Sequence, residues 1–174
     1  MPSLKELALT QERLKHLLHY NPDNGVFIWR NRSASRSNRI KAGDVAGCIK
    51  TDSGYVVINI DGKSYRAHRL AWFYVYGVWP KQKIDHINNI KSDNRILNLR
   101  EASNSENGWN IGAPATNTSG VKGVCWDKQT QKWRAQCWVS GKHYVLGRFA
   151  SIDEAAMVVA RFREKHHGEF CNHG

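Results

Sequence analysis

The sequence lacks a long apolar run: no stretch approaches the roughly 20 residues that a membrane-spanning helix needs. Its first residues read Met-Pro-Ser-Leu-Lys-Glu, without the apolar segment of a signal peptide. Both absences argue against a membrane or secreted protein. We therefore expect a cytoplasmic location and no membrane partner.

Cysteine is also sparse, and its spacing is uninformative for metals. Cys48, Cys125, Cys137 and Cys171 are scattered, without any C-x-x-C pair. This pattern argues against a zinc knuckle and against a dense disulfide framework. We expect reduced thiols.

Acidic residues are the minority charge. Lys and Arg total 26 against 15 Asp and Glu, giving a formal net charge of +11, and the excess lies on both sides of residue 111. A polyanion is the expected partner. The alternative is a basic surface that is merely solvated, but seven Trp and six Tyr among the basic residues favour contacts with bases and phosphates.

The chain changes character near residue 112, which predicts two domains. The segment Gly112–Gly120 has no apolar period and no charge, as is typical of a linker. We therefore predict one domain over residues 1–111, a linker over 112–119 and a second domain over 120–174.

The first domain should mix helices with short strands. Leucines at helical spacing predict one or two short helices within residues 4–18, and Asp61-Gly62 predicts a hairpin turn. The other expected elements are a turn at 21–25, strands at 26–29, 55–60 and 64–66, and a buried helix at 67–76.

A basic, serine-rich stretch follows the strand at 26–29. Residues 30–41 are too polar for a core, and we interpret them as a loop that lies on phosphate, with Arg36 and Arg39 among its DNA contacts. The alternative is a solvated loop without a ligand.

The second domain is predicted as three strands and one helix. The strands are expected at 121–126, 132–139 and 142–149, and the Ser151 to Glu154 spacing predicts a capping box that opens the helix. Alternation places Trp133, Ala135, Cys137 and Val139 under the helix.

The opposite face of that sheet is a candidate DNA reader, because a thin sheet can enter the major groove. The alternative for Trp138 is a contact with the first domain. The predicted DNA-contacting residues of this domain are Lys122, Lys128, Arg134, Gln136, Trp138, Lys142, His143 and Arg148.

A polar motif lies between residues 85 and 107. Asp85 and His86 end a predicted strand, Asn98 follows His86 after twelve positions, and Asn107 follows nine further on, in a helix that a Ser103 capping box opens. A carboxylate, amide oxygens and an imidazole together suit a hard divalent metal ion beside a general base.

Some polar residues nearby have simpler explanations. Asp93 and Asn94 are interpreted as turn formers rather than ligands. His68 lies among apolar neighbours and is interpreted as structural, with a phosphate contact beside Arg69 as the alternative.

This spacing resembles the HNH family of ββα-metal nucleases, in the variant that ends in Asn. It is especially similar to phage and intron homing endonucleases, in which a Tyr-x-x-His-Arg-Leu element precedes the Asp-His; here Tyr65 stands before Arg66-Ala-His-Arg-Leu70. The resemblance, over about residues 20–110, implies His86 as general base, Asn98 as the residue that orients it, and Asp85 and Asn107 as metal ligands. Arg69 is also predicted as a DNA contact.

The second domain resembles the Apetala-two (ethylene-response-factor) DNA-binding domain over about residues 118–172. The matching strings are Gly120-Val-Lys-Gly-Val-x-Trp126, Lys132-Trp-Arg-Ala135, Leu146-Gly-Arg-Phe149, Glu154-Ala-Ala156 and His167-Gly-Glu-Phe170. Gln136 and Trp138 depart from the charged residues common in this family.

Together the two resemblances imply an α+β chain, with a ββα-metal nuclease domain followed by a three-stranded antiparallel sheet on one helix. We expect a metal-dependent endonuclease that cuts double-stranded DNA to 5′-phosphate and 3′-hydroxyl ends, as a monomer or weak dimer. The cofactor should be one Mg²⁺ or Mn²⁺ ion and no zinc. The alternatives are a non-catalytic DNA-binding regulator with a degenerate HNH domain, and a nuclease that acts on RNA.

Overall fold

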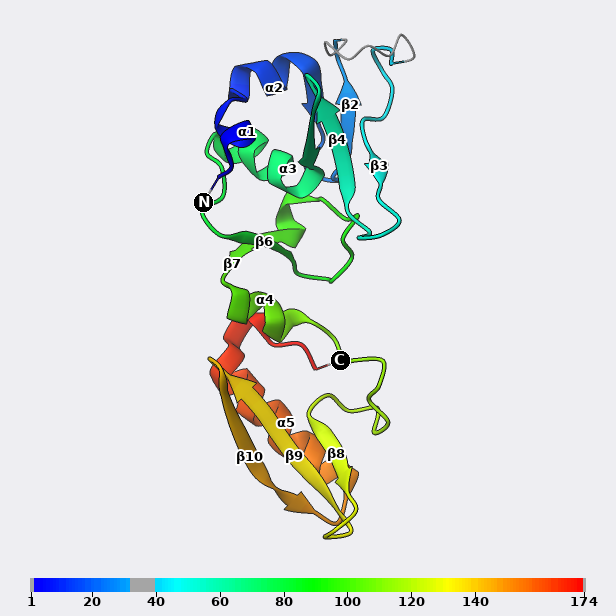
Figure 1. Cartoon of the computed structure of the whole chain (residues 1–174), viewed down its shortest axis with the longest axis vertical. Coiled ribbons are helices and arrows are strands. Elements are labelled where there is room, and N and C mark those ends of the chain that lie inside the picture. Colours follow the sequence, from blue (N-terminus) through cyan, green and yellow to red (C-terminus); the bar gives the residue numbers. More distant parts are fainter. Residues whose placement is uncertain (1, 32–39, 174) are drawn as a thin grey trace. The chain divides into compact units, whose positions relative to one another are not determined.

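The computed structural model describes residues 2–31 and 40–173 of the chain. Contacts within it define two units, Met1–Ala102 and Ser103–Gly174. Both units combine helices with small antiparallel sheets, an α+β architecture (Figure 1). The predicted DNA contacts Arg36 and Arg39 lie outside the described residues.

Within the part of the chain that the structure describes, no helix is both long and apolar enough to span a membrane.

The helices of the first unit are α1 (Leu4–Leu7), α2 (Gln11–Leu17) and α3 (Ala67–Tyr76). Thr10 opens α2 by accepting a hydrogen bond from the Arg13 backbone, and Gly77 ends α3 with a positive φ of 73°. One expectation is wrong: Leu18 does not continue the helix, because it pairs with Trp29 as the first residue of a strand.

The strands of the first unit form three small antiparallel sheets. The hairpin predicted at Asp61-Gly62 is present, and both turn residues have the positive φ that a two-residue turn requires. The strands are β1 (Leu18–Tyr20) with β2 (Phe27–Trp29), β3 (Cys48–Ile49) with β4 (Val56–Ile60) and β5 (Lys63–Arg66), and β6 (Lys83–His86) with β7 (Leu99–Ala102).

One apolar core holds the helices and sheets of the first unit together. Leu14 of α2, Ile58 of β4 and Leu70 of α3 have no exposed surface. Ile84 of β6 and Leu99 of β7 join the same core. The hairpin that carries Asp85 and His86 is thereby fixed against α3 and β4.

An ion pair between Glu6 and Arg69 ties α1 to α3. The Arg69 Nε lies 2.5 Å from a Glu6 carboxylate oxygen, and the two side chains are 18% and 8% exposed. Arg69 also donates to the carbonyl groups of Pro80 and Gln82. Its guanidinium is therefore engaged within the fold, and the DNA contact expected from the sequence stays a prediction.

The second unit begins with α4 (Asn104–Asn110), which the predicted capping box of Ser103 and Glu106 opens. Its sheet has the order β10-β9-β8, and one long helix follows. The elements are β8 (Val124–Asp127), β9 (Lys132–Val139), β10 (Lys142–Phe149), α5 (Ile152–His167) and a 3-10 turn at Gly168–Phe170. The segment predicted as a linker, residues 112–119, lies inside this unit.

The start of α5 corrects one expectation. Ser151 caps the helix by accepting a hydrogen bond from the Asp153 backbone, but the side chain of Glu154 does not complete a capping box.

The alternation predicted for β9 is confirmed by burial: Ala135 and Cys137 are covered, whereas Trp138 is 60% exposed.

The Glu6–Arg69 ion pair generates a prediction about stability. Replacing Glu6 by Gln leaves the Arg69 charge largely buried without its partner, so the free energy of unfolding should fall by about 2 kcal/mol. Urea denaturation at pH 7 measures it. Asp61→Asn is the control, because the Arg13–Asp61 pair is exposed and screened; an equal loss in both variants would contradict the assignment.

The same pair predicts a pH dependence. Burial raises the pKa of Glu6, but the hydrogen bonds from Arg69 and Ser3 and the charge of Arg69 together outweigh it, and the net pKa is lowered. A lowered pKa in the folded state stabilises the fold above the pKa of the unfolded carboxyl, about 4.3. The difference between wild type and Glu6→Gln should therefore shrink as the pH falls below that value.

Candidate active site

Asp85 lies in the β6–β7 hairpin directly opposite Arg100. A guanidinium nitrogen of Arg100 approaches one carboxylate oxygen of Asp85 to 2.9 Å, and Asp85 is 5% exposed. A buried carboxylate needs such a partner to keep its charge. The sequence analysis missed Arg100, although cross-strand opposite charges are a common pairing in sheets.

His86 is the next residue of β6 and is equally buried. Its Nε2 lies 3.3 Å from the Asn94 Oδ1, and the Asn94 amide nitrogen donates to the Ser92 carbonyl. The amide oxygen of Asn94 thus faces the ring, so Nε2 carries the proton and donates it, and Nδ1 carries the lone pair.

The charge state of His86 follows from its burial. Burial lowers the pKa of His86 below its usual value and outweighs the Asn94 hydrogen bond and the nearby Asp85 carboxylate, which raise it. The imidazole is therefore neutral at pH 7, as a general base must be.

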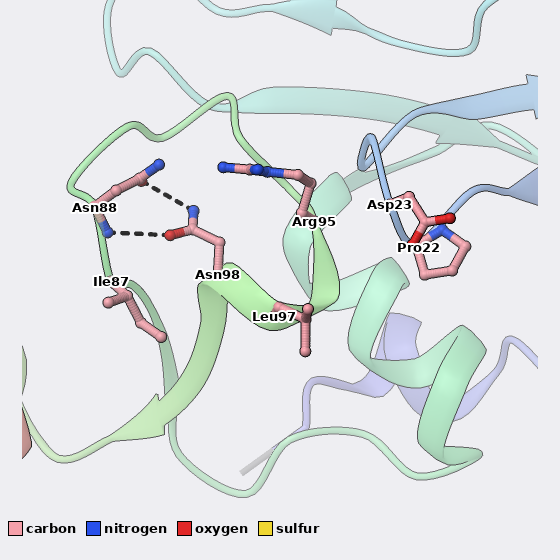
Figure 2. A pocket seen from close by; sticks show the side chains of 7 residues that line it. All are labelled: Pro22, Asp23, Ile87, Asn88, Arg95, Leu97 and Asn98. Atoms are coloured by element: carbon pink, nitrogen blue, oxygen red, sulfur yellow. Dashed lines mark hydrogen bonds between the residues drawn. The ribbon is translucent and has the colours of Figure 1, made fainter.

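Asn98 closes the loop between β6 and β7. Its side-chain nitrogen donates to the Asn88 Oδ1 at 2.9 Å and to the Asp93 carbonyl at 2.8 Å, and its oxygen accepts from the Asn88 backbone at 3.0 Å. Figure 2 shows the two hydrogen bonds to Asn88 beside a cavity of about 270 Å³ that Arg95 also lines. A single amide thus braces the whole loop.

Asn94 is a part of this site that the sequence analysis missed. Interpreted as a turn former, it is 2% exposed and touches the candidate base. The turn at residues 21–25 holds it: the Tyr20 hydroxyl donates to its carbonyl, and the Gly25 backbone lies so close that a Cβ would meet Asn94 and Arg95. No local pattern announces a contact over this sequence distance.

His68 packs behind the candidate base. Its ring meets those of His86 and Tyr55, in each case at 5.1 Å between centroids. Burial lowers the pKa of His68 well below its usual value, and its Nδ1 has no hydrogen-bond partner among the described residues. These surroundings are those of a core residue, which favours the structural interpretation over the phosphate contact.

Asn107 lies in α4 and belongs to the second unit, whereas Asp85 belongs to the first. Their pairing on one metal ion stays a prediction. The donor types fit Mg²⁺, which takes oxygen ligands and few of them from protein. Among residues 2–31 and 40–173, no group of three or more His, Cys, Asp or Glu side chains could hold a metal.

The exposed face of the second sheet carries most of the predicted DNA-contacting side chains. Gln136 and Trp138 both contact His143 across the strands. Arg148 pairs with Asp127 at 2.8 Å while staying 44% exposed, and Lys128 and Lys142 are exposed. Arg134 is half-buried and donates to the Cys125 sulfur.

Lys122 does not belong to that exposed set. Its ammonium group donates to the carbonyls of Trp109, Ile111 and Asn172, and burial lowers the pKa of Lys122 to about 8. The charge is therefore used within the unit, and the phosphate contact expected from the sequence stays a prediction.

Comparison with known proteins defines the class. The HNH endonuclease family model matches residues 65–109, the segment that contains α3, the β6–β7 hairpin and most of α4. This domain indicates a nuclease-type function and nucleic-acid binding. No solved structure matches the chain.

A relative defines the family. Over 110 residues the chain is 37% identical to Protein 3.8 of Escherichia phage T7, an alignment that covers 63% of this chain and 90% of that protein. The chain therefore belongs to the family of phage T7 Protein 3.8 and carries an HNH endonuclease domain.

The geometry of Asn98 generates a prediction. Asn98→Ala removes three hydrogen bonds from the loop and leaves the Asp93 carbonyl without this donor, so the free energy of unfolding should fall by about 2 kcal/mol. Thermal unfolding measures it, with Leu97→Ala as the control, because Leu97 is adjacent and 90% exposed. A Leu97→Ala loss as large as that of Asn98→Ala would contradict the bracing role.

Proposed function

We propose that this protein is a metal-dependent endonuclease that hydrolyses double-stranded DNA. The observation that carries the proposal is the buried, neutral His86, which directly follows Asp85 in a hairpin that Asn98 braces. Burial, tautomer and loop geometry together suit a general base held at a fixed position. The HNH match over the same residues supports this assignment.

The chemistry follows from the side chains. His86 takes the proton of the attacking water on Nδ1, while Asn94 holds Nε2 and thereby fixes the ring. Asp85 and Asn107 would be the oxygen ligands for one Mg²⁺ or Mn²⁺ ion. When bound, that ion supplies positive charge to the phosphate and the leaving oxygen. The expected products have 5′-phosphate and 3′-hydroxyl ends.

We assign sequence reading to the second unit. The exposed face of β9 and β10 combines cationic, amide and aromatic side chains, and its three-strand, one-helix order fits the Apetala-two resemblance. A homing or nicking endonuclease of phage or intron origin is the form of the proposal that agrees with the phage relative.

A DNA-binding regulator without catalysis is the second candidate. The observation that favours it is the Arg100 guanidinium, which already neutralises the Asp85 carboxylate. In that case the HNH unit would bind DNA but not cut it.

Cleavage of supercoiled plasmid distinguishes these candidates. Wild type should cut with Mg²⁺ and stop when EDTA is added, and His86→Ala should lower the single-turnover rate by about 10²-fold or more, because proton transfer is lost. DNA affinity, measured by fluorescence anisotropy, should stay unchanged, because His86 adds little to the phosphate contacts.

His68→Asn is the control, because it changes the packing beside the His86 ring and leaves His86 itself in place. A wild-type rate in His86→Ala would show that His86 is not the base. A wild-type protein that binds DNA and never cuts it, with Mg²⁺ or Mn²⁺, would favour the regulator.

The sheet face generates a prediction about specificity. Substituting Arg134, Gln136 or Trp138 by Ala should relax sequence preference, since each polar base contact contributes roughly 1–3 kcal/mol. Lys142→Ala should weaken binding to all sequences alike, through a lost phosphate contact. Profiling of cleavage sites measures both effects. Unchanged profiles for all three strand variants would show that another surface of the protein recognises the DNA sequence.

A further inference from the structure

A cavity of about 240 Å³ lies within the second unit, lined by residues of α4, β9 and α5. Lys122, Arg163 and His167 contribute basic side chains to its wall. Among the residues that the structure describes, none of those lining this cavity is acidic. Figure 1 shows α4 next to the end of α5, so residues far apart in sequence meet here. The cavity therefore gathers basic groups without a carboxylate to balance them.

Arg163 of α5 is the most buried of these basic residues, at 3% exposed. Its Nη2 donates to the Lys122 carbonyl at 2.7 Å, but its Nε has no hydrogen-bond partner among the described residues. Within that part of the chain it also forms no ion pair with a carboxylate. A guanidinium stays charged when it is buried, so its burial is costly unless an anion compensates it.

Gly123 shapes the cavity around this guanidinium. Its φ is +80°, which favours glycine. A Cβ at this position would lie 2.7 Å from the Arg163 Nη2 and 2.5 Å from the Gln136 carbonyl oxygen. Any larger residue would therefore displace Arg163 or the strand. The local backbone thus leaves the space that the buried charge occupies.

His167 lies one helical turn after Arg163, on the same face of α5. Its Nε2 donates to the Trp138 carbonyl at 3.2 Å, so Nδ1 carries the lone pair of the neutral ring. Burial lowers the pKa of His167, which keeps the ring neutral at pH 7. Nδ1 is buried and has no hydrogen-bond partner among the described residues. The cavity wall thus contains an unused acceptor as well as an unused donor.

Trp109 of α4 holds this imidazole in place. Its indole lies flat on the ring, with 4.4 Å between centroids and 3° between planes. The end of α4 is fixed in turn, because Lys122 donates to the carbonyls of Trp109 and Ile111, and the Asn172 amide donates to that of Asn110 at 2.7 Å. The last carbonyls of a helix have no partner within it, so these bonds satisfy them.

Lys122 contributes charge to the cavity but no free donor. Its ammonium group already donates to three carbonyls. Burial and, second, the charge of Arg163 lower the pKa of Lys122 to about 8. Two cationic groups therefore repel each other inside the unit, and an anion beside them would stabilise both.

The unused groups define the chemistry of a ligand. Arg163 offers an N–H donor and His167 offers an acceptor, so the ligand needs an acceptor oxygen, a hydroxyl and a negative charge. A singly protonated phosphate has all three. Sulfate and carboxylates at neutral pH only accept hydrogen bonds.

We propose that this cavity binds a phosphate group, with Arg163 donating to one of its oxygens and His167 accepting from its hydroxyl. Free inorganic phosphate and a nucleoside monophosphate present this same chemistry. The site belongs to the second unit alone and does not depend on the nuclease activity proposed above.

The test is isothermal titration calorimetry of the full-length protein with inorganic phosphate at pH 7, with sodium chloride holding the ionic strength constant. Arg163→Met should weaken binding about tenfold or more, because a hydrogen bond between charged groups is lost. Arg161→Met is the matched control, since Arg161 is an exposed residue of the same helix, and this variant should bind like wild type.

Two further measurements serve if Arg163→Met does not fold. His167→Phe keeps a flat ring against Trp109 and removes Nδ1, so it should lose the preference for phosphate over sulfate. In wild type, the Nε–H resonance of Arg163 should shift on addition of phosphate, and less on addition of sulfate at the same concentration.

Titration with thymidine monophosphate identifies the source of the phosphate group. Tighter binding than that of inorganic phosphate assigns the site to a nucleotide, whose base adds contacts. Equal or weaker binding assigns it to free phosphate.

Three outcomes would overturn the proposal. The first is that neither phosphate nor thymidine monophosphate binds. The second is that sulfate binds as tightly as phosphate, which would show a general attraction of anions. The third is an equal loss in Arg161→Met and Arg163→Met, which would assign the binding to overall charge.

Discussion

The first unit depends on one constraint. Strands β6 and β7 pair over only four residues each, and this pairing must hold together the ends of the long polar loop that connects them. Such a short pairing is weak by itself. Ile84 and Leu99 anchor the two strands in the apolar core, and the side chain of Asn98 closes the loop between them by hydrogen bonding. The burial of His86 and its contact with Asn94, which lies in this loop, depend on this closure.

The polar contacts around His86 form a chain of dependence. Asn94 holds the ring, the Tyr20 hydroxyl and the Gly25 turn hold Asn94, and β1 and β2 hold that turn. A buried polar network is stabilising only when its members are satisfied. The N-terminal turn, which contributes no chemistry, is thereby part of what keeps the candidate base in position.

Much of the fold was predictable because the signals are local. The Asp61-Gly62 turn, the end of α3 at Gly77 and the alternation along β9 each depend on residues close in sequence. The spacing of Asp85, His86, Asn98 and Asn107 likewise led to the HNH domain that the family match supports.

The rest required contacts between distant segments. Whether Asn94 turns the chain or holds an imidazole, and whether Lys122 meets phosphate or three carbonyls, is decided by packing. Arg69 is a similar case, because a basic residue beside a nuclease motif looks the same in sequence whether it binds DNA or Glu6. A Ser-x-x-Glu string also does not guarantee a capping box, as α5 shows.

A carbonyl group at the end of α4 is satisfied by a residue far along the chain, and this affects the order in which the protein can fold during synthesis. Asn172 lies 62 residues downstream of Asn110, whose carbonyl it satisfies. Domains generally fold as they emerge from the ribosome, N-terminal first. A nascent chain can therefore complete the Asp85–His86 hairpin while α4 still lacks its C-terminal partners. The helix that carries Asn107 is finished only when the end of the second unit has been made.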